Sequence, residues 1–172
     1  MSEPRVVAEP IAADRLDLLP LRVEHAEEMA VALSDPALHR FIGGTPLSPD
    51  ALRTRYERLV AGSPDPAVSW CNWALWLRAE SCLVGTVQAT IPLDGGAEIA
   101  WVIGTPWQRR GFASEAARAL VAWLGRGAVH TVVAHIHPAH HASASVATAA
   151  GLAPTEDRQD GEIRWLRRLH RP

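Results

Sequence analysis

The sequence predicts a single mixed α/β domain with a mostly antiparallel sheet, and three observations support this fold class. The chain has 172 residues, which is typical of one domain. Apolar residues make up 48% and charged residues 21%, a balance typical of a globular core. Strand-like and helix-like patterns alternate, and one helical segment separates two strands, which predicts a parallel pair with a right-handed crossover.

The predicted domain spans residues 14–172 and follows a loose leader, residues 1–13. It contains about four helices. The predicted elements, in chain order, are strand 16–23, helix 24–34, helix 49–61, strands 69–78, 82–92 and 98–103, helix 112–125, strand 131–136, helix 143–150, strand 152–157 and strand 162–169.

The N-terminal elements are predicted from their breakers and end signals. Pro20 interrupts the first strand, which predicts a position at a sheet edge. The next segment contains helix formers with acidic residues in its first turn, and Asp35-Pro36 ends it. Ser48 is a favoured N-cap for the second helix, which ends at Gly62.

The later elements follow from apolar patterning. Residues 69–78 are apolar and aromatic on both faces, as in a buried strand, and residues 82–92 are rich in β-branched side chains. A turn at residues 94–96 leads to the next strand. Residues 112–125 have apolar side chains at helical spacing, and Gly151 is a C-cap by position. The last strand alternates in polarity.

Composition excludes several classes of function. A net charge of −2 and a pI near 6.4 predict no overall attraction to nucleic acid or to an anionic membrane. No apolar run approaches the ~20 residues of a membrane span, and the N-terminus resembles no signal peptide. All 17 basic residues are Arg, which excludes lysine-based covalent catalysis and a Walker-A loop. Two cysteines form no disulfide framework, which favours a reduced, cytoplasmic location.

The segment 103–114 is the most informative part of the chain, because a buried strand gives way to a donor-rich loop and then to a helix start. Free N–H groups and the helix dipole favour an anion there. Gly111 and Ala113 are small enough for close backbone approach. Arg109 and Arg110 add charge, and Ser114 adds a hydroxyl. The residues predict a phosphate or diphosphate site, with an ordinary strand–loop–helix connection as the alternative.

The same segment resembles a known family. The spacing Gln108-x-x-Gly111-x-Ala113 matches the Q/R-x-x-G-x-G/A motif of the GNAT acyltransferases. The string AEIAWVIGTPWQRRGFASEAARAL and the later segment HPAHHASASVATAAGL are similar to the ribosomal-protein N-terminal acetyltransferase (RimJ/RimL-like) branch. The resemblance covers residues 14–169. It implies the GNAT fold, in which the parallel strands 98–103 and 131–136 splay apart.

The resemblance implies acetyl-CoA as cosubstrate and no metal. The diphosphate would lie on the N–H groups of residues 109–114, and the pantetheine arm would pair with the preceding strand. A strand N–H would also donate to the thioester oxygen as charge develops. In this chain His140 replaces a family Asn near the cofactor. The expected cofactor-binding residues are Trp101, Val102, Ile103, Gln108, Arg109, Arg110, Gly111, Phe112, Ala113, Ser114 and His140.

Three residues are candidates for acid–base catalysis. The family often places a general-base Glu on the strand that contains Glu98, although a Glu there could also pair with an Arg or face solvent. His135 on the facing strand is the second candidate base. Ala147 stands about where many members have a Tyr acid, and the single Tyr is far away in the second helix. Ser143 is therefore the candidate acid, with helix capping as its alternative role.

Two side-chain clusters have structural explanations. Five histidines between residues 130 and 141 could hold a metal, but no Cys lies nearby and no carboxylates are interleaved, so no metal site is predicted. Trp70 and Trp76 share one face of their strand and Trp73 lies on the other. We expect these tryptophans in the core, with a part in the acceptor pocket as the alternative.

The resemblance implies an N-acyltransferase that moves an acetyl group from acetyl-CoA to a primary amine by direct attack in a ternary complex. The acceptor is a protein N-terminus or a small molecule, and loop 35–50 and the final strands would shape its site. An antibiotic- or polyamine-modifying enzyme would show an acidic pocket, for which Asp35, Asp50, Glu156 and Asp157 are available. A non-catalytic acyl-CoA-binding or regulatory domain is the alternative from another class. For the oligomeric state, both a monomer and a homodimer are consistent with the sequence.

Overall fold

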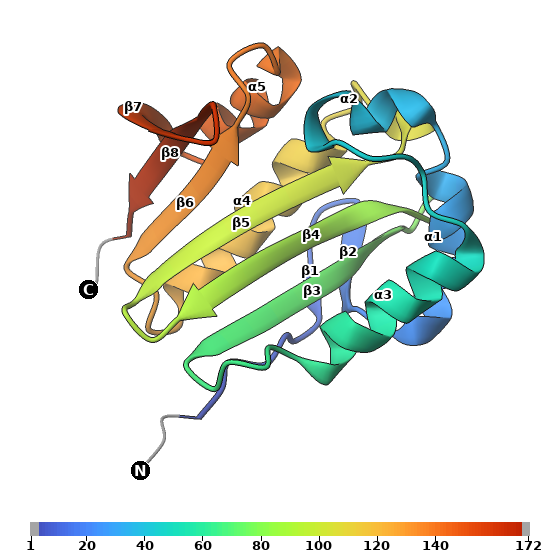
Figure 1. Cartoon of the computed structure of the whole chain (residues 1–172), viewed down its shortest axis with the longest axis horizontal. Coiled ribbons are helices and arrows are strands. Elements are labelled where there is room, and N and C mark those ends of the chain that lie inside the picture. The colour runs from blue at the N-terminus through green and yellow to red at the C-terminus, as the bar shows by residue number, and fades with distance from the viewer. Residues whose placement is uncertain (1–3, 170–172) are drawn as a thin grey trace.

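The computed structural model describes residues 4–169 and contains one eight-stranded sheet with helices on both faces (Figure 1). The strand order is β1-β2-β3-β4-β5-β6-β8-β7. The strands are β1 (Ile11–Ala12), β2 (Leu16–Pro20), β3 (Val68–Leu77), β4 (Cys82–Pro92), β5 (Gly96–Ile103), β6 (Thr131–Ile136), β7 (Ala153–Gln159) and β8 (Glu162–Arg168). The α-helices are α1 (Ala26–Ala32), α2 (His39–Ile42), α3 (Pro49–Ala61), α4 (Phe112–Gly125) and α5 (His141–Ala149).

The mixed α/β class and most of the predicted elements are confirmed. The strands over 82–92 and 131–136 and the helix over 112–125 have the predicted bounds. Ser48 caps α3, because its hydroxyl accepts a hydrogen bond from the N–H of Ala51 at 3.2 Å. The predicted edge position of the first strand is wrong, because β1 pairs with Asp17 and Leu18 and is itself the edge strand. Pro20 lies at the end of β2, beyond those two residues, so its missing N–H removes no bond to β1.

Three local predictions differ from the structure. Loop 35–50 contains a 3-10 turn and the four-residue helix α2, so the described chain has five α-helices rather than about four. The first helix is shorter than predicted, since its start is a 3-10 turn at Val23–His25. The leader is not wholly loose: β1 forms within it, and the Trp73 indole N–H donates to the carbonyl of Glu9 at 2.8 Å.

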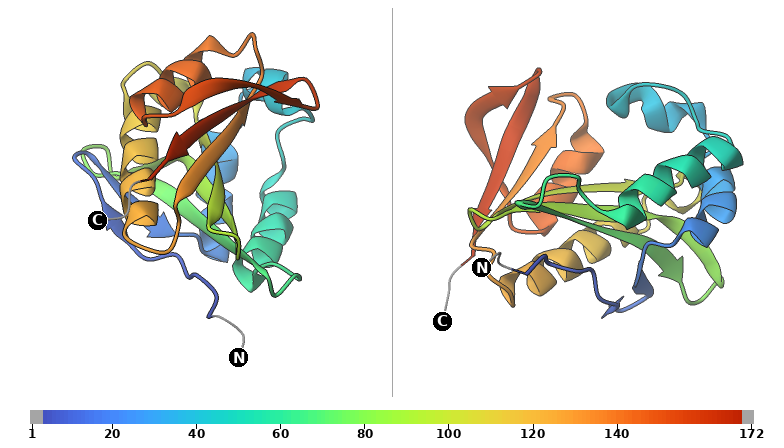
Figure 2. Two further views of the ribbon diagram at one scale, coloured as in Figure 1. Left: turned by 90° about the vertical axis from the view of Figure 1, so that its left-hand side faces the viewer. Right: turned by 60° about the horizontal axis from the view of Figure 1, so that its bottom comes forward.

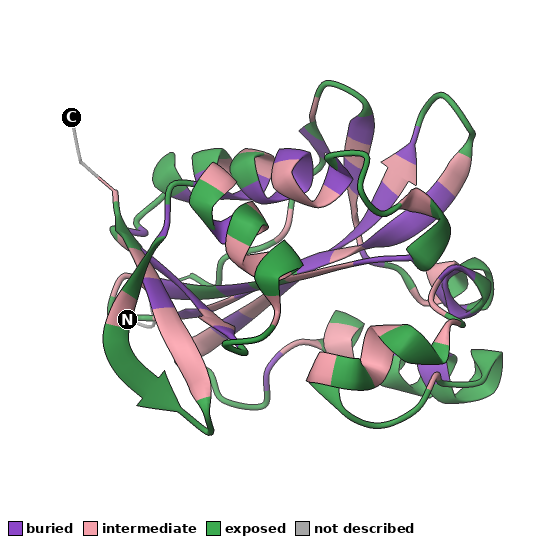
Figure 3. Cartoon of the chain, turned by 90° about the horizontal axis from the view of Figure 1, so that it is seen from above, coloured by how far each residue is buried: buried purple, intermediate pink, exposed green. Residues whose placement is uncertain are grey.

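The core lies on both faces of the sheet. Alternation along β3 places Trp73 in the layer under α4, where it meets Trp123 edge-on at 5.1 Å between ring centroids. Trp76 packs on the opposite face, in the smaller layer under α1 and α3. The predicted placement of Trp73 and Trp76 on opposite faces is thus confirmed, whereas Trp70 is in neither core layer. Viewed from above, buried residues line the sheet and exposed residues cover β7 (Figure 3).

The sheet opens between β5 and β6. These parallel strands pair only between residues 96–98 and 131–133. Farther along, β5 pairs with β4 and β6 pairs with β8, so the facing edges of β5 and β6 diverge. Figure 2 shows β6, β7 and β8 turned away from the rest of the sheet. The splay that the family resemblance implied is therefore present.

Candidate acyl-CoA site

The loop after β5 is held tightly to the end of the strand. Gly85 on β4 permits the close approach of β5, because a Cβ there would lie 2.1 Å from the carbonyl oxygen of Val102. The Gly104 N–H donates to the carbonyl of Val84 at 2.8 Å. The side-chain amide of Gln108 donates to the carbonyl of Ile103 at 2.9 Å. Gln108 therefore braces the loop against the strand.

The loop then turns through two left-handed residues into α4. Arg109 has φ 62° and Gly111 has φ 83°, and the helix begins at Phe112. Within the described chain, no hydrogen bond uses the backbone N–H of any residue from 109 to 114; the first helical bond joins the Glu115 N–H to the carbonyl of Gly111. Unpaired N–H groups at the positive end of a helix dipole form an anion site.

The two loop arginines have different surroundings. The Arg110 guanidinium forms an ion pair with Glu80 at 2.8 Å and lies 4.9 Å from the centroid of the Phe112 ring. The hydrogen bond from Arg110 lowers the pKa of Glu80. Arg109 has no hydrogen bond or ion pair with any residue in 4–169. Arg109 is therefore the arginine that is free to bind a phosphate.

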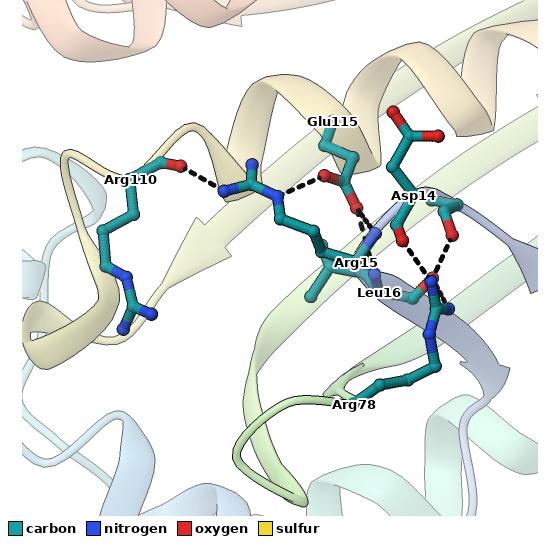
Figure 4. A network of polar contacts seen from close by, with 7 residues as sticks. Asp14, Arg15, Leu16, Arg78, Arg110 and Glu115 are labelled. Carbon is teal, nitrogen blue, oxygen red and sulfur yellow. Dashed lines mark hydrogen bonds and ion pairs between the residues drawn. The ribbon is translucent and has the colours of Figure 1, made fainter.

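A buried carboxylate fixes the first turn of α4 to the N-terminal strand (Figure 4). Glu115 is 7% exposed and accepts three hydrogen bonds: from the Arg15 guanidinium at 2.8 Å, from the Arg15 N–H at 2.8 Å and from the Leu16 N–H at 3.0 Å. Burial alone raises the pKa of Glu115, but the hydrogen bonds and charge of Arg15 outweigh it and the pKa is lowered. Arg15 also donates to the carbonyl of Arg110 at 2.8 Å.

The two candidate bases lie in direct contact where β5 and β6 begin to part. Nδ1 of His135 and Oε1 of Glu98 are 2.9 Å apart. The Glu98 side chain is 57% exposed and that of His135 is 15% exposed. Glu98 thus pairs with a histidine rather than with an arginine, and its side chain also faces solvent, as one of the two alternatives expected. Nε2 of His135 has no partner among residues 4–169.

The candidate acid has no structural role as a helix cap. α5 begins at His141 with His140 as its N-cap, and no side chain caps it. Ser143 lies in the first turn of α5, and its hydroxyl forms no hydrogen bond inside the described part of the chain. Capping by Ser143 is therefore wrong. Ala147 is fully buried, which explains why a small residue occupies this position.

His140 joins α5 to α2. Its ring stacks on Phe41 with the centroids 4.2 Å apart, and His137 lies 5.3 Å from the same ring. Burial lowers the pKa of His140, and the neighbouring His137 and His141 lower it further. Among residues 4–169, no three His, Cys, Asp or Glu side chains are grouped so that they could hold a metal ion.

A cavity of about 580 Å³ lies beside β5, on the sheet face that α1 and α3 cover. Ala100 and Val102 line it, and strand alternation places Glu98 on the same face. Tyr56 also lines it and is 4% exposed, and burial raises its pKa to about 12. From the sequence we expected this tyrosine far from the reaction segment, in the second helix; the structure has it in that helix and in the same cavity lining as Trp101 and Val102. Loop 35–50 forms part of the wall, whereas the final strands β7 and β8, which we also expected to shape an acceptor site, contribute no lining residue.

Comparison with known proteins agrees with this geometry. The family model for the acetyltransferase (GNAT) domain matches residues 15–153, and the chain belongs to that family. Membership implies an acyl-CoA-dependent acetyltransferase. A search of curated protein sequences gave no match. In residues 4–169, no helix is both long enough and apolar enough to cross a membrane.

Solved structures share the fold at low identity. A GNAT-family acetyltransferase from Bacillus anthracis is 19% identical, with a TM-score of 0.77 over 93% of this chain and 98% of its own. The ribosomal L7/L12 α-N-protein acetyltransferase RimL, in complex with coenzyme A, is 15% identical, with a TM-score of 0.78 over 94% and 98%. AAC(6')-Ib, in complex with paromomycin and acetyl-CoA, is 14% identical, with a TM-score of 0.73 over 90% and 94%.

Proposed function

We propose that this protein transfers an acetyl group from acetyl-CoA to a primary amine by direct attack in a ternary complex. The observation that carries the proposal is the row of unpaired N–H groups at residues 109–114, which adjoins the free edge of β5. A diphosphate fits the first feature and an extended amide-bearing arm fits the second. The proposed catalytic domain is residues 14–172.

In the proposed complex the cofactor takes most of its contacts from backbone. The diphosphate lies on the N–H groups around Gly111, with Arg109 as the added cation. The pantetheine arm lies along Trp101, Val102 and Ile103, beyond the point where β6 diverges. A strand held rigidly by β4 on its other side keeps the thioester in a fixed position, which lowers the entropic part of the barrier.

The Glu98–His135 pair is the proposed general base. Glu98 accepts the Nδ1 proton, which leaves Nε2 to take a proton from the attacking ammonium. The neutral amine then forms the C–N bond, a β5 N–H stabilises the oxyanion, and the C–S bond breaks. We assign protonation of the thiolate to Ser143, whose hydroxyl has no other partner among residues 4–169. The hydroxyl gives its proton to the sulfur and takes the surplus proton of the amine nitrogen as the intermediate collapses, so that a neutral amide, a free thiol and a neutral Ser143 result.

Two rival functions are less well supported. A polyamine- or antibiotic-modifying enzyme needs an acidic pocket, but Asp35, Asp50, Glu156 and Asp157 are absent from the residues that line the 580 Å³ cavity. A non-catalytic binding domain has no need of a paired Glu and His at the splay.

The direct test is release of free thiol from acetyl-CoA over a panel of amines and N-terminal peptides. Turnover of one class, reduced by Glu98→Gln with little change in acetyl-CoA affinity, would support the proposal. Tight binding of acetyl-CoA without turnover of any amine would instead favour the binding domain. Glu27→Gln is a matched control, because Glu27 is exposed on α1 and absent from the cavity.

A further inference from the structure

We propose that the acceptor amine carries a carboxylate at the far end of an apolar body, and that Arg55 binds this carboxylate. The inference rests on the proposed function, because it places the acceptor in the cavity beside β5. Its evidence is the charge, the lining residues and the length of that cavity. The proposal for the cofactor rests instead on the N–H groups of residues 109–114 and on the edge of β5.

The charge of the cavity favours an anionic group on the acceptor. Of the residues that line it, Arg55 is the one with a permanent charge, and no Asp or Glu is among them. Arg55 has no ion pair or hydrogen bond within residues 4–169. A polycation would bring several ammonium groups into a space without a carboxylate partner, which is costly. A carboxylate would receive the planar fork of the guanidinium.

The walls of the cavity favour an apolar body between the two ends of the acceptor. Side chains from α1, α3 and the segment around α2 form these walls. The apolar residues among them are Leu21, Ala30, Leu33, Leu38, Ile42, Leu47, Leu52 and Leu59. Apolar lining with a few placed polar groups is the usual character of a small-molecule site, and 580 Å³ is an ordinary volume for one.

The floor of the cavity contains polar groups that no protein atom satisfies. Asn72 on β3 pairs in register with Gln88 on β4, and Thr86 lies two residues before Gln88 on the same face. None of these three side chains forms a hydrogen bond with another residue in the part of the chain that the structure describes. They are free to bind polar atoms along the acceptor, such as a peptide amide.

The span of the cavity sets the separation between amine and carboxylate. Arg55 is on α3, which lies over β3, whereas the amine must reach β5 (Figure 1). β4 lies between these strands, so the two ends are about 10 Å apart. An α-amino acid is too short for both contacts. An ω-amino acid or a short peptide with a free amine and a free C-terminus has the required length.

The experiment compares each carboxylate with its neutral analogue. The first arm uses 8-aminooctanoate against octylamine, and the second uses the tripeptide Ala-Leu-Leu, which spans about 10 Å when extended, against its C-terminal amide. Spermidine is the polycation. We expect the carboxylate member of at least one arm to have a kcat/KM about 10- to 100-fold higher. The arm with the larger preference tells an ω-amino acid from a peptide. Equal turnover within both arms, or preference for spermidine, would overturn the inference.

Variants on α3 assign the preference to one side chain. Arg55→Gln should lower kcat/KM for the carboxylate to the value for its neutral analogue, which removes the preference. Arg53→Gln, an exposed arginine outside the cavity lining, should keep it. An equal effect of both variants would mean general surface charge and would contradict the assignment.

A binding measurement separates this inference from the proposed function. Calorimetric titration of the same carboxylates into the CoA-bound protein needs no turnover. Binding that Arg55→Gln weakens, without acetylation of any amine, would keep Arg55 as the carboxylate-binding residue of the cavity and overturn the proposed function. Acetylation of carboxylate-bearing amines at a rate that Arg55→Gln does not change would support the proposed function and overturn the role of Arg55.

Discussion

Glu98 and His135 are 37 residues apart in sequence, yet Oε1 of Glu98 and Nδ1 of His135 are 2.9 Å apart, with His135 two residues beyond the last residue of β6 that pairs with β5. The pairing ends at residues 98 and 133, so the contact lies at the start of the splay. A carboxylate in this position orients the imidazole and fixes which nitrogen is free. Two side chains that the sequence offered as rival bases thus form one unit.

Loss of this unit should lower turnover more than it lowers cofactor affinity. We expect His135→Ala to reduce kcat by about 100-fold or more, the usual contribution of a general base, with the Kd for acetyl-CoA nearly unchanged. Glu98→Gln should cost less, because the ring nitrogen that accepts the proton remains. Thiol-release kinetics measure the first quantity and calorimetry the second. A fall in acetyl-CoA affinity equal to the fall in kcat would contradict a role as base.

Glu115 should be among the most important polar residues for stability. Glu115→Ala leaves the N–H groups of Arg15 and Leu16 without their acceptor, and we expect a loss of about 3 kcal/mol of unfolding free energy. Urea denaturation measures it. Glu57→Ala, on the exposed face of α3, is the control and should change stability by less than about 0.5 kcal/mol. Equal losses of unfolding free energy in the two variants would show that the hydrogen bonds of Glu115 do not stabilise the fold more than an exposed Glu does.

The same carboxylate gives stability a defined dependence on pH. The pKa of Glu115 is lowered in the folded protein, so its contribution is fully present above the ordinary carboxyl pKa and is lost as the pH falls through the lowered value. The difference in unfolding free energy between the natural protein and Glu115→Gln should therefore shrink on acidification. A difference that stays constant from pH 7 to pH 3 would contradict the lowered pKa.

Restoring the family tyrosine should not improve this enzyme. Ala147 is fully buried, and a Tyr there must displace packed neighbours, with a cost of about 1–3 kcal/mol or more. We expect Ala147→Tyr to lower the thermal midpoint and to leave kcat no higher. Ser145→Tyr, at an exposed position of the same helix, tests the tyrosine without the packing cost. A rise in kcat for Ala147→Tyr would show that a tyrosine acid fits here and that the assignment to Ser143 is wrong.

Local sequence signals predicted the elements that position the cofactor. Helix α4 has the predicted bounds because Gly111 precedes it and its apolar residues repeat at helical spacing. The strands β4 and β6 are equally clear, since β-branched residues dominate them. Helix α2 was missed because four residues carry no periodicity.

Contacts between segments far apart in the chain could not be predicted from the sequence, because local patterns carry no information about the partner segment. Arg15 and Glu115 are 100 residues apart, and no pattern in either segment names the other. The same holds for Phe41 on His140, and for Tyr56, which folding brings to the cavity beside β5. The one available signal was an acidic residue in the first turn of an otherwise apolar helix, which favours Glu115 without revealing its partner.

The most direct test of the account is the affinity of the loop 109–114 for acetyl-CoA, measured by titration calorimetry. Gly111→Val places a branched side chain over the unpaired N–H groups, and we predict a loss of at least about 100-fold in affinity. Gly161→Val is the matched control: Gly161 has φ 80°, close to the 83° of Gly111, and lies in the open β7–β8 turn. Unchanged affinity in Gly111→Val, or an equal loss in both variants, would contradict the assignment of the diphosphate to this loop.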